Sequence, residues 1–450
     1  MKRSRHSPRS LRVAVAVASA CLALSAELVQ PAAADDASPL HFTEAIALAE
    51  KANAELPVAA LDVAIANQRE REAEAERRLQ LVLEGDVIVA PSSGYDPIIT
   101  NLGEERLQLA LTHTLYSGGG LEAAVREAKA GAAVAGARYR QALRDVDLQV
   151  RLAFAQSLAA REEIKVRRDG IKRLRGYISL VASRQRSGQA VAADFLRAQV
   201  RLASDRSALL DAEGRLEASH RDLNTLMGRA PDTALELAPL PPPEEALAPA
   251  ADAWDATPEV AAARHSAAAA AAALGVAQSE RKPHVVARVD AGLWGSDTQH
   301  LIPPDLSASD PGANFVDRLQ RDAGYSLSVG LTWPLSGWGA IRARIAQAQL
   351  ALEQSHKNVK AVSTSARLEW SQARGAMRVA LAQYRLLSTA EPTSRDGLLE
   401  AESRYRGGVG TSLEVIDAFS AALDTSVAAI QSKLAWRTAQ ALAIRWGEKP

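Results

Sequence analysis

The apolar positions of the chain follow a helical period, change to strict alternation and then return to the helical period. An Ala/Glu/Arg-rich helix is expected from Thr43 to about Arg77. Two alternating segments follow, at about 79–90 and 105–115, and then a very long helical segment from about 121 to 186. A turn that contains glycine, near residue 188, precedes a returning helix of about 35 residues. The 66 residues of the long segment correspond to about 100 Å of helix, which no single globular domain encloses.

The second half of the chain repeats this order of elements. At an offset of 220 residues, and without a gap, Gly119 meets Gly339 and Gly188 meets Gly408. The second copy is therefore expected to contain strands at about 284–294 and 325–333, a long helix at about 341–406 and a turn near 408. Pro392 lies inside this long helix, so a kink or a break is expected there.

A Pro-rich stretch at residues 239–256 separates the two copies, because successive prolines supply no amide donors to a helix or a central strand. The first repeat is assigned to residues 35–238 and the second to residues 257–450. Residues 1–34 have the order of a secretory signal peptide: a basic start, an apolar stretch and small residues before Asp35. The chain is therefore expected to be exported as one duplicated unit.

Cys21, the only cysteine, lies within or just after the apolar stretch of this N-terminal segment. Its surroundings resemble a bacterial lipoprotein cleavage box, although Ala18 stands where such boxes usually carry Leu. Two outcomes are therefore open: ordinary cleavage after Ala34, or cleavage before a lipidated Cys21. In both cases the mature chain has no disulfide.

The four alternating segments have the length and polarity of transmembrane barrel strands. Each contains about 9–11 residues, with apolar side chains on one face and carboxylates, Arg or hydroxyls on the other. One such segment alone would better suit a half-buried strand of a soluble sheet, but four of them in an exported chain favour the membrane. Trp294, Trp333 and Trp338 lie at or just beyond strand ends, where an interfacial belt of aromatic residues is usual.

Four strands cannot close a barrel, and an open sheet edge leaves backbone groups unpaired in lipid. The protomer must therefore oligomerise. Two copies would supply about 8 strands, whose interior is filled by side chains, and three would supply about 12, which leave room for a lumen. The long helices would then continue the barrel as a helical tube of roughly 100 Å.

Composition supports this interpretation and excludes several alternatives. The chain has 450 residues, 47% of them hydrophobic and only 4% aromatic, so most of its apolar content is Ala, Leu and Val, which suit closely packed helices. A mean hydropathy of −0.11 excludes a bundle of membrane-spanning helices. Lys plus Arg and Asp plus Glu both number 53, so no nucleic-acid partner is expected.

A convergent catalytic or metal site is not evident in the sequence. The eight His residues show no metal-ligand spacing, and the glycines at 118–120 lack the Lys-Ser/Thr of a phosphate loop. Ser279 and Lys282 fit a Ser-x-x-Lys spacing, but they stand where helix passes to strand and lack the companion motifs. We therefore expect no enzymatic activity, no cofactor and no bound metal.

Four short segments resemble those of the TolC-type outer-membrane efflux proteins, the outer membrane factors of tripartite export systems. They are the strand exits Thr114–Gly120 and Pro334–Gly339 and the turns Arg184–Asp194 and Arg404–Glu414. The resemblance covers nearly the whole mature chain and implies a mainly α protein with a small transmembrane β part. It implies a homotrimer whose 12-stranded β-barrel, with four strands per protomer, is continued by a periplasmic α-helical coiled-coil barrel. It also implies a location in the bacterial outer membrane, in contact with its lipid.

By the same resemblance the protein is a passive, gated exit duct. Substrates would pass from an inner-membrane pump, driven by protons or ATP, and a periplasmic adaptor (membrane fusion) protein to the exterior. The residues implied to contact the adaptor are those of the two tip turns: Arg186, Gly188, Val191, Arg406, Gly408 and Val409. The residues implied to narrow the periplasmic gate are Asp194, Glu414 and Asp417, whose symmetry copies would form carboxylate rings.

Two departures from the family pattern and several simpler interpretations accompany these assignments. Glu414 stands where the family commonly has Asp, and Gly410 stands where some members have a basic latch residue. The tip turns also suit an ordinary αα-hairpin, and the three carboxylates suit solvated positions near a helix N-terminus. The rival function is a soluble periplasmic coiled-coil scaffold without a channel, and a weaker one is an enzyme with an unrecognised site. The cargo stays open among drugs, metal ions and secreted proteins.

Overall fold

The computed structural model describes residues 39–89, 103–244, 253–296, 323–337 and 339–447. The predicted signal peptide, residues 1–34 with Cys21, lies outside the described residues, as do Trp338, the side chain of Trp294 and the middle of the Pro-rich linker. The two alternatives for N-terminal processing therefore stay predictions.

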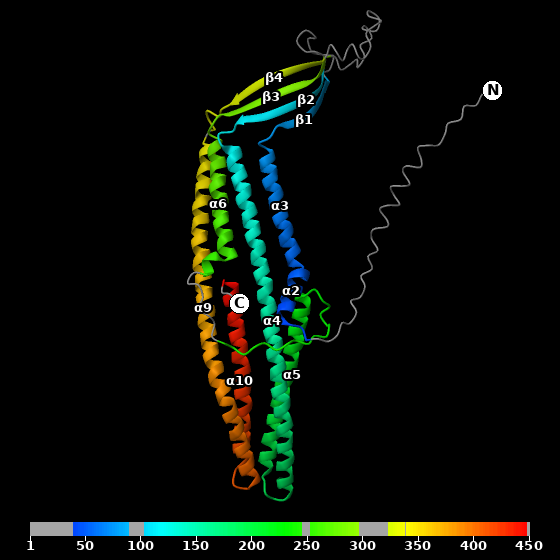
Figure 1. Ribbon diagram of the computed structural model, residues 1–450, viewed down its shortest axis with the longest axis vertical. Helices are drawn as coiled ribbons and strands as arrows, with labels where there is room; N and C mark the ends of the chain where they lie inside the picture. The colour runs from blue at the N-terminus through cyan, green and yellow to red at the C-terminus, as the bar shows by residue number, and fades with distance from the viewer. Residues whose placement is uncertain (1–38, 90–102, 245–252, 297–322, 338, 448–450) are drawn as a thin grey trace, which may run out of the picture.

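The protein is an elongated bundle of helices with a four-stranded sheet at one end and two helical hairpin tips at the other (Figure 1). Two long helices, α4 (Gly120–Arg186) and α9 (Ala340–Arg406), each of 67 residues, run from the sheet to the tips. Beside each of them lie two shorter helices, one near the sheet and one near the tip: α3 (Glu55–Ala75) and α5 (Ala192–Leu226) beside α4, and α6 (Pro258–Ser279) and α10 (Ser412–Arg445) beside α9. The fold therefore contains the duplicated unit that the sequence predicts.

The opening helix of the first repeat is interrupted, and the prediction of one helix over residues 43–77 was wrong. The structure has α2 (Phe42–Ala52) and α3 (Glu55–Ala75) instead. Asn53 lies between them in an extended conformation, and its side-chain oxygen accepts a hydrogen bond from the first amide of α3 at 2.8 Å. Pro57, in the first turn of α3, lacks the amide that would continue the helix across this point. The pair of Asn53 and Pro57 was the signal that the sequence interpretation missed.

Of the kink or break expected at Pro392, the break does not occur: α9 continues through this residue as one helix. Proline inside a helix removes one backbone donor and crowds the preceding turn, at a cost of about 3 kcal/mol. Packing offsets this cost: Leu381 is buried against α10 before the proline, and Leu398 is buried near the tip after it. Glu391, next to the proline, accepts a hydrogen bond from Ser426 of α10 at 3.1 Å. Contacts with α10 thus hold α9 continuous.

The sheet is antiparallel, with the order β1 (Gln80–Val89), β2 (Gly103–Tyr116), β3 (His284–Ser296) and β4 (Ala323–Thr332). Each repeat supplies one antiparallel pair, and the pairing of β2 with β3 joins the two repeats. A register line of Leu81, Leu111, Val289 and Leu327 runs across all four strands. The alternating apolar positions of the four strands therefore share one face of the sheet.

This apolar face of the sheet is left uncovered. Its large side chains are between 37% and 85% exposed: Leu81, Leu83, Leu107, Leu109, Val289, Tyr325, Leu327, Val329 and Leu331. Figure 1 shows the sheet extending past the ends of the helices, so the bundle does not cover it. An exposed apolar surface of this extent is costly in water and suits the hydrocarbon of a membrane.

Polar contacts fix the junction between the sheet and the helices. The indole N–H of Trp333, a side chain that is 57% exposed, donates to the carbonyl of Arg281 at 3.3 Å. The Lys282 ammonium donates to the carbonyl of Gly118 at 2.7 Å. Gly118 has a φ of 65°, and a Cβ there would lie 2.7 Å from the Cβ of Lys282, so the junction requires glycine at this position.

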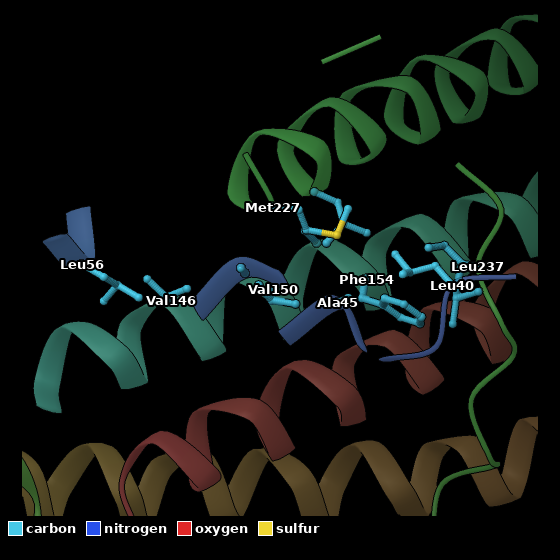
Figure 2. Packing of buried hydrophobic residues seen from close by; sticks show 12 residues of the cluster. Leu40, Ala45, Leu56, Val146, Val150, Phe154, Met227 and Leu237 are labelled. Carbon is cyan, nitrogen blue, oxygen red and sulfur yellow. The ribbon is translucent and has the colours of Figure 1, made fainter. Parts of the chain in front are cut away.

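The largest core cluster lies where α2, α4, the end of α5 and the loop after α5 converge (Figure 2). Phe154 is fully buried, and its ring makes an edge contact with Phe42, with 5.4 Å between the centroids. Leu40 pairs with Leu237 in a parallel bridge, which attaches the start of the described chain to the loop before the linker. The first repeat is thereby closed on itself before the linker begins.

Among the described residues, α6 is the helix whose length and composition would allow it to span a bilayer, and 22% of its most apolar window is buried inside the protein. This helix packs against α4 and α9 and is followed by β3. Its small residues permit this approach, since a Cβ at Gly275 would lie 3.1 Å from the Cβ of Ala123. We therefore assign α6 to the helical bundle.

Replacement of Gly292 with valine is expected to disrupt the pairing of β2 with β3. A Cβ at Gly292 would overlap the carbonyl oxygen of Leu107 and lie 2.5 Å from the Cα of Gln108, closer than relaxed contacts allow. The expected result is loss of the folded, heat-modifiable species when the detergent-solubilised protein is run on a gel.

Gly330→Val is the matched control for this prediction, because a Cβ at Gly330 has its nearest neighbour, the carbonyl oxygen of Val286, at 4.0 Å. The control should keep the heat-modifiable species. Equal loss in both variants would contradict the steric explanation for Gly292.

Candidate functional site

The two hairpin tips have nearly identical backbone turns. Gly188, after α4, has a φ of 73°, and Gly408, after α9, has a φ of 78°. The amide of Gly188 donates to the carbonyl of Gln185 at 3.0 Å, and the amide of Gly408 donates to the carbonyl of Tyr405 at 3.1 Å. Such bonds close a helix C-terminus when a glycine adopts the left-handed conformation. The two tip glycines predicted from the sequence are therefore required by the turns themselves.

Arg184, in the last turn of α4, ties the first tip to the second. Its guanidinium donates to the backbone carbonyls of Tyr405 at 2.6 Å and of Arg406 at 2.7 Å, at the C-terminus of α9. It also lies over the Tyr405 ring, 4.8 Å from the centroid. A cation at this place satisfies helix-terminal carbonyls and opposes the negative end of the helix dipole. Nothing in the local sequence indicated this role, because Tyr405 is 221 residues away from Arg184.

Two tyrosines are buried between the hairpins, behind this contact. Tyr177 of α4 and Tyr405 of α9 are 7% and 5% exposed, and their ring centroids are 5.4 Å apart. The Tyr177 hydroxyl donates to Oγ of Ser412, the first residue of α10, at 2.8 Å. Burial raises the pKa of Tyr177 far above its ordinary value, so the phenol stays neutral and keeps its proton to donate. The hairpins of both repeats are therefore joined by a polar contact inside an apolar cluster.

Asp194, the first predicted gate residue, lies in the first turn of α5, directly after the first tip. Its side chain is 18% exposed, and one carboxylate oxygen lies 3.7 Å from the guanidinium of Arg197. The negative charge of Asp194 contributes to the raised pKa of Tyr177, as expected for a carboxylate close to that tyrosine. Asp194 is therefore a partly buried carboxylate rather than a fully solvated one.

Glu414 and Asp417, the other two predicted gate residues, lie in the first two turns of α10, directly after the second tip. Thr411 caps this helix, and its hydroxyl accepts a hydrogen bond from the amide of Glu414 at 3.3 Å. Both carboxylates are exposed to solvent in the single chain. The structure thus brings all three predicted gate residues to the same end of the molecule.

The predicted adaptor-contacting residues include uncovered apolar side chains. Val191 is 64% exposed and Val409 is 77% exposed. Arg406 pairs with Glu402 at 3.0 Å, and both line an open groove of about 630 Å³ between α4 and α9. The Arg186 guanidinium turns back to its own helix at 3.4 Å from the Ala182 carbonyl. The tips thus present two exposed valines beside two arginines.

The turn at Gly410 leaves little room for a side chain. A Cβ there would lie 3.0 Å from the amide nitrogen of Tyr405 and 3.1 Å from the Cβ of Arg404. The amide of Gly410 donates to the carbonyl of Arg404 at 3.0 Å. A basic latch residue at this position, which the family resemblance implies for some members, would therefore require the neighbouring backbone to shift, and Arg184 brings a cation to this tip from the other repeat.

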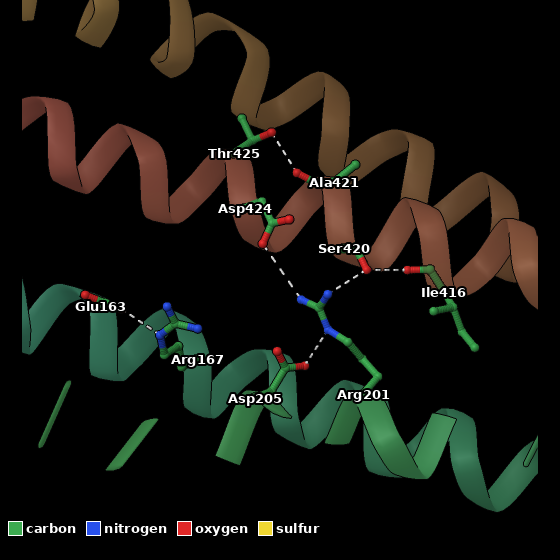
Figure 3. Close-up of polar contacts among 9 residues, drawn as sticks. All are labelled: Glu163, Arg167, Arg201, Asp205, Ile416, Ser420, Ala421, Asp424 and Thr425. Carbon is green, nitrogen blue, oxygen red and sulfur yellow. Dashed lines mark hydrogen bonds and ion pairs between the residues drawn. The ribbon is translucent and has the colours of Figure 1, made fainter. Parts of the chain in front are cut away.

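Arg201 links α5 to α10 above the tips, a contact that the sequence did not indicate (Figure 3). It donates to Asp205 on its own helix at 3.0 Å and to Ser420 of α10 at 2.9 Å. Its guanidinium also lies 3.8 Å from the carboxylate of Asp424. Because Asp205 is only 3% exposed, a buried charge holds the guanidinium in place and fixes the two helices to each other.

Glu163 provides a second buried charge, between α4 and α5. It is 5% exposed and accepts hydrogen bonds from Arg167 and from Arg215 of α5, both at 2.7 Å. Removing one partner of such a group leaves an uncompensated buried charge, at a cost of about 3–5 kcal/mol. The second repeat has Gln383 and Ala435 at the corresponding positions, 220 residues later. This ionic link is therefore specific to α4 and α5 of the first repeat.

Replacing Arg184 with alanine is expected to loosen the second tip without unfolding the bundle. The variant loses two hydrogen bonds from a cation to helix-terminal carbonyls, each worth about 1.5–3 kcal/mol. Amide hydrogen exchange of residues 398–412 should therefore accelerate by about ten-fold or more, while exchange around Phe154 stays unchanged.

Arg186→Ala is the matched control for Arg184, because the contact of the Arg186 guanidinium is with its own helix. This variant should leave exchange at residues 398–412 as it is. Equal acceleration in both variants would contradict the role assigned to Arg184.

The tips offer charge and apolar contact rather than reactive groups. Within the described ranges, no group of three or more His, Cys, Asp or Glu side chains could hold a metal ion.

The Ser-x-x-Lys spacing lies at the other end of the molecule, beside the sheet. The Ser279 hydroxyl donates to the carbonyl of Val276 at 2.6 Å, and the Lys282 ammonium donates to the carbonyl of Gly118. The two residues of the Ser-x-x-Lys spacing therefore serve the junction between helix and strand.

The fold is shared with solved outer-membrane channels. OprN, described as an outer-membrane channel, superimposes with a TM-score of 0.80 at 19% sequence identity, over 91% of this chain and 90% of that chain. VceC, an outer membrane protein from Vibrio cholerae, superimposes with a TM-score of 0.78 at 19% identity, over 90% of this chain and 96% of that chain. These likenesses confirm the predicted fold class, a mainly helical protein with a small β part.

Among curated relatives, the pyoverdine export outer membrane protein OpmQ of Pseudomonas putida is 26% identical over 271 residues. That match covers 59% of this chain and 53% of OpmQ, so the chain spans about half the length of this relative. The family model named Outer membrane efflux protein matches twice, at residues 45–229 and 251–444. The predicted outer-membrane location is therefore confirmed. The resemblance carried by the tip turns and strand exits is confirmed as well, and the chain belongs to the outer membrane efflux protein family.

Proposed function

We propose that this chain forms the passive, gated exit duct of a tripartite efflux or type I secretion system. In this role a homotrimer conducts substrates from an inner-membrane pump, driven by protons or ATP, and a periplasmic adaptor to the exterior. The observation that carries the proposal is the contrast between the two ends of the molecule. An uncovered apolar sheet lies at one end and two paired helix tips lie at the other, joined along their whole length by α4 and α9.

The sheet supports a trimer because β1 and β4 are its edges. Unpaired backbone groups cost several kcal/mol each in lipid, so β4 of one protomer pairs with β1 of the next. Three protomers close a barrel of about 12 strands that holds a lumen, whereas two would give about 8 strands with a filled interior.

The gate lies at the end remote from the membrane. Threefold symmetry turns Asp194, Glu414 and Asp417 into carboxylate rings, which favour cations and oppose leakage of anions. The contact of Arg184 with Tyr405 holds the two tips of each protomer together. Opening therefore requires either that this contact breaks or that both tips move as a unit.

The adaptor docks on the tips. Val191 and Val409 are exposed apolar side chains at the ends of the hairpins, which a partner would cover. Arg406 and the groove beside it add a charged rim. An apolar centre with a polar rim is the usual anatomy of a protein–protein interface.

Extraction and reconstitution distinguish the duct from a soluble periplasmic scaffold. The duct stays in the outer-membrane fraction until detergent is added, migrates as a heat-modifiable trimer and conducts ions in planar bilayers. Release into buffer without detergent would overturn the duct and leave the scaffold. A detergent-solubilised monomer that conducts no ions would overturn it as well.

We also propose that the chain has no enzymatic activity of its own. Support comes from its family, which is described as efflux proteins, and from the structural engagement of Ser279 and Lys282. Turnover of a hydrolase substrate by the purified trimer, together with its loss in Ser279→Ala, would overturn this part of the proposal.

A further inference from the structure

A network of polar side chains crosses the face of the sheet opposite to the apolar one. Arg288 of β3 is at its centre: its Nη2 donates to Glu84 of β1 at 2.5 Å, and its Nε donates to Asp290 at 2.7 Å. Glu84 also accepts a hydrogen bond from the side-chain amide of Gln108 of β2 at 2.7 Å, and the hydroxyl of Ser326 of β4 donates to Asp290 at 3.3 Å. One guanidinium thus connects side chains from all four strands.

Arg288 reaches Glu84 across β2, over positions that carry little or no side chain. Ala110 of β2 pairs in register with Asp290 and is 1% exposed. Gly292 of β3 has no room for a Cβ. The charged groups therefore lie on the surface of the sheet, where Glu84 and Arg288 are each 35% exposed and Asp290 is 12% exposed.

The alternation of the strands decides where this network faces. Successive side chains of a strand point to opposite faces. Glu84 therefore faces away from Leu83, and Asp290 faces away from Val289, both of which belong to the uncovered apolar face. When that apolar face meets lipid, the network lines the lumen of the closed barrel.

The charged members of the network lie within four residues of one another along the strands. Glu84 is in register with Gln108 and, through it, with Gly292, so Arg288 is offset from Glu84 by four residues, which corresponds to about 13 Å along the strand. Asp86 and Arg106 are opposite each other in the register and carry opposite charges. Glu84, Arg288 and Asp290 thus leave one net negative charge per protomer, and threefold symmetry repeats it as a belt around the lumen.

We propose that Glu84, Arg288 and Asp290 form a second selectivity element of the duct, inside the barrel and remote from the tips. It favours small cations over small anions, and Arg288 sets the strength of this preference because it neutralises one of the two carboxylates. The proposal rests on the proposed duct function and assigns a specificity-determining site to the outer-membrane end. Rings of charged side chains act in this way when screening is weak, and the Debye length is about 10 Å at 0.1 M salt.

The test is the reversal potential of single channels under a KCl gradient near 0.1 M. The variants are made in a background of Asp194→Ala, Glu414→Ala and Asp417→Ala, so that the tip rings do not dominate the selectivity. Arg288→Gln should raise the permeability ratio of K⁺ to Cl⁻ by about two-fold or more, and Glu84→Gln should lower it by a similar factor. Both shifts should shrink at 1 M KCl, where the Debye length is about 3 Å.

Two controls separate charge from packing. Arg288→Lys keeps the positive charge but not the fork that bridges two carboxylates, so its permeability ratio should stay that of the background. Arg221→Gln removes a charge far from the sheet, on α5, where Arg221 pairs with Glu217 and Asp232. It should also leave the ratio unchanged.

The outcomes are distinguishable. A conducting trimer whose reversal potential is the same in Arg288→Gln and Glu84→Gln as in the background overturns the selectivity element but leaves the duct intact. If Arg288→Gln does not assemble, Ser328→Lys serves instead, because it adds a charge to the same exposed face beside Arg288. An unchanged ratio in that variant overturns the element too. A protein that conducts no ions overturns the duct, and with it this inference.

Discussion

Replacing Asp194 and Glu414 together with alanine should raise the single-channel conductance of the reconstituted trimer by about two-fold or more. Both side chains follow a tip turn directly, one on α5 and one on α10, so their symmetry copies converge where the helical tube ends. Removing six carboxylates per trimer widens this constriction, so the conductance should rise. It also removes the field that concentrates cations there, so the preference for K⁺ over Cl⁻ should fall. Both quantities are measured in planar bilayers.

The matched control for the gate variant removes the same number of carboxylates far from the tips. Asp222, near the end of α5, and Glu353, in the half of α9 nearer to the sheet, are both exposed. The double variant Asp222→Ala with Glu353→Ala should conduct like the wild type. Unchanged conductance and cation selectivity in Asp194→Ala with Glu414→Ala would remove these two residues from the gate.

Gly408→Pro should abolish efflux while leaving the trimer assembled. Gly408 has a φ of 78°, which proline cannot adopt, and its amide donates to the carbonyl of Tyr405. The substitution therefore destroys the turn on which the exposed Val409 stands, at the end of the molecule opposite to the sheet. Efflux is measured as survival of a deletion strain, complemented with each variant, in a compound against which the wild-type chain protects. Assembly is measured as the heat-modifiable trimer.

Gly397→Ala is the matched control for the tip variant, since Gly397 lies inside α9 and a Cβ there has no neighbour within 4 Å. Alanine at a helical position is slightly stabilising, by about 0.5–1 kcal/mol, so both efflux and assembly should persist. Normal efflux by Gly408→Pro would show that the second tip is not the docking point for the adaptor.

The regular elements of this protein could be predicted because their signals are local. Strict alternation marked the four strands, and the strands of the structure begin and end within two residues of the alternating segments. The split between α2 and α3 was missed because the helical period continues through it, although Asn53 and Pro57 stood there. At Pro392 the sequence predicted a kink or a break, but the helix is unbroken. Packing against α10 offsets the cost of the proline, and local sequence does not reveal this packing.

The positions of the candidate site residues could be predicted in part, and their roles in gating and docking stay predictions. The two tip glycines form the turns, and the three carboxylates lie in the first two turns of the helices that follow. The structure places all five residues at one end of the molecule. Tyr177, buried beside Tyr405, had no signal in the sequence, since nothing local distinguishes it from a tyrosine on an exposed helix face. The same holds for Arg201, one of many arginines in a chain with 53 basic residues.

By itself the sequence determined the duplicated unit, the alternating strands and the pair of very long helices. Period and repeat are properties of neighbouring residues or of a fixed offset, so one chain is enough to establish them. Only the tertiary structure decided which polar groups meet across the repeats. Arg184 donates a hydrogen bond to the carbonyl of Tyr405, 221 residues later, and Arg288 donates one to Glu84, 204 residues earlier. A charged side chain carries no local mark of its partner, and the partner is set by how the two repeats pack against each other.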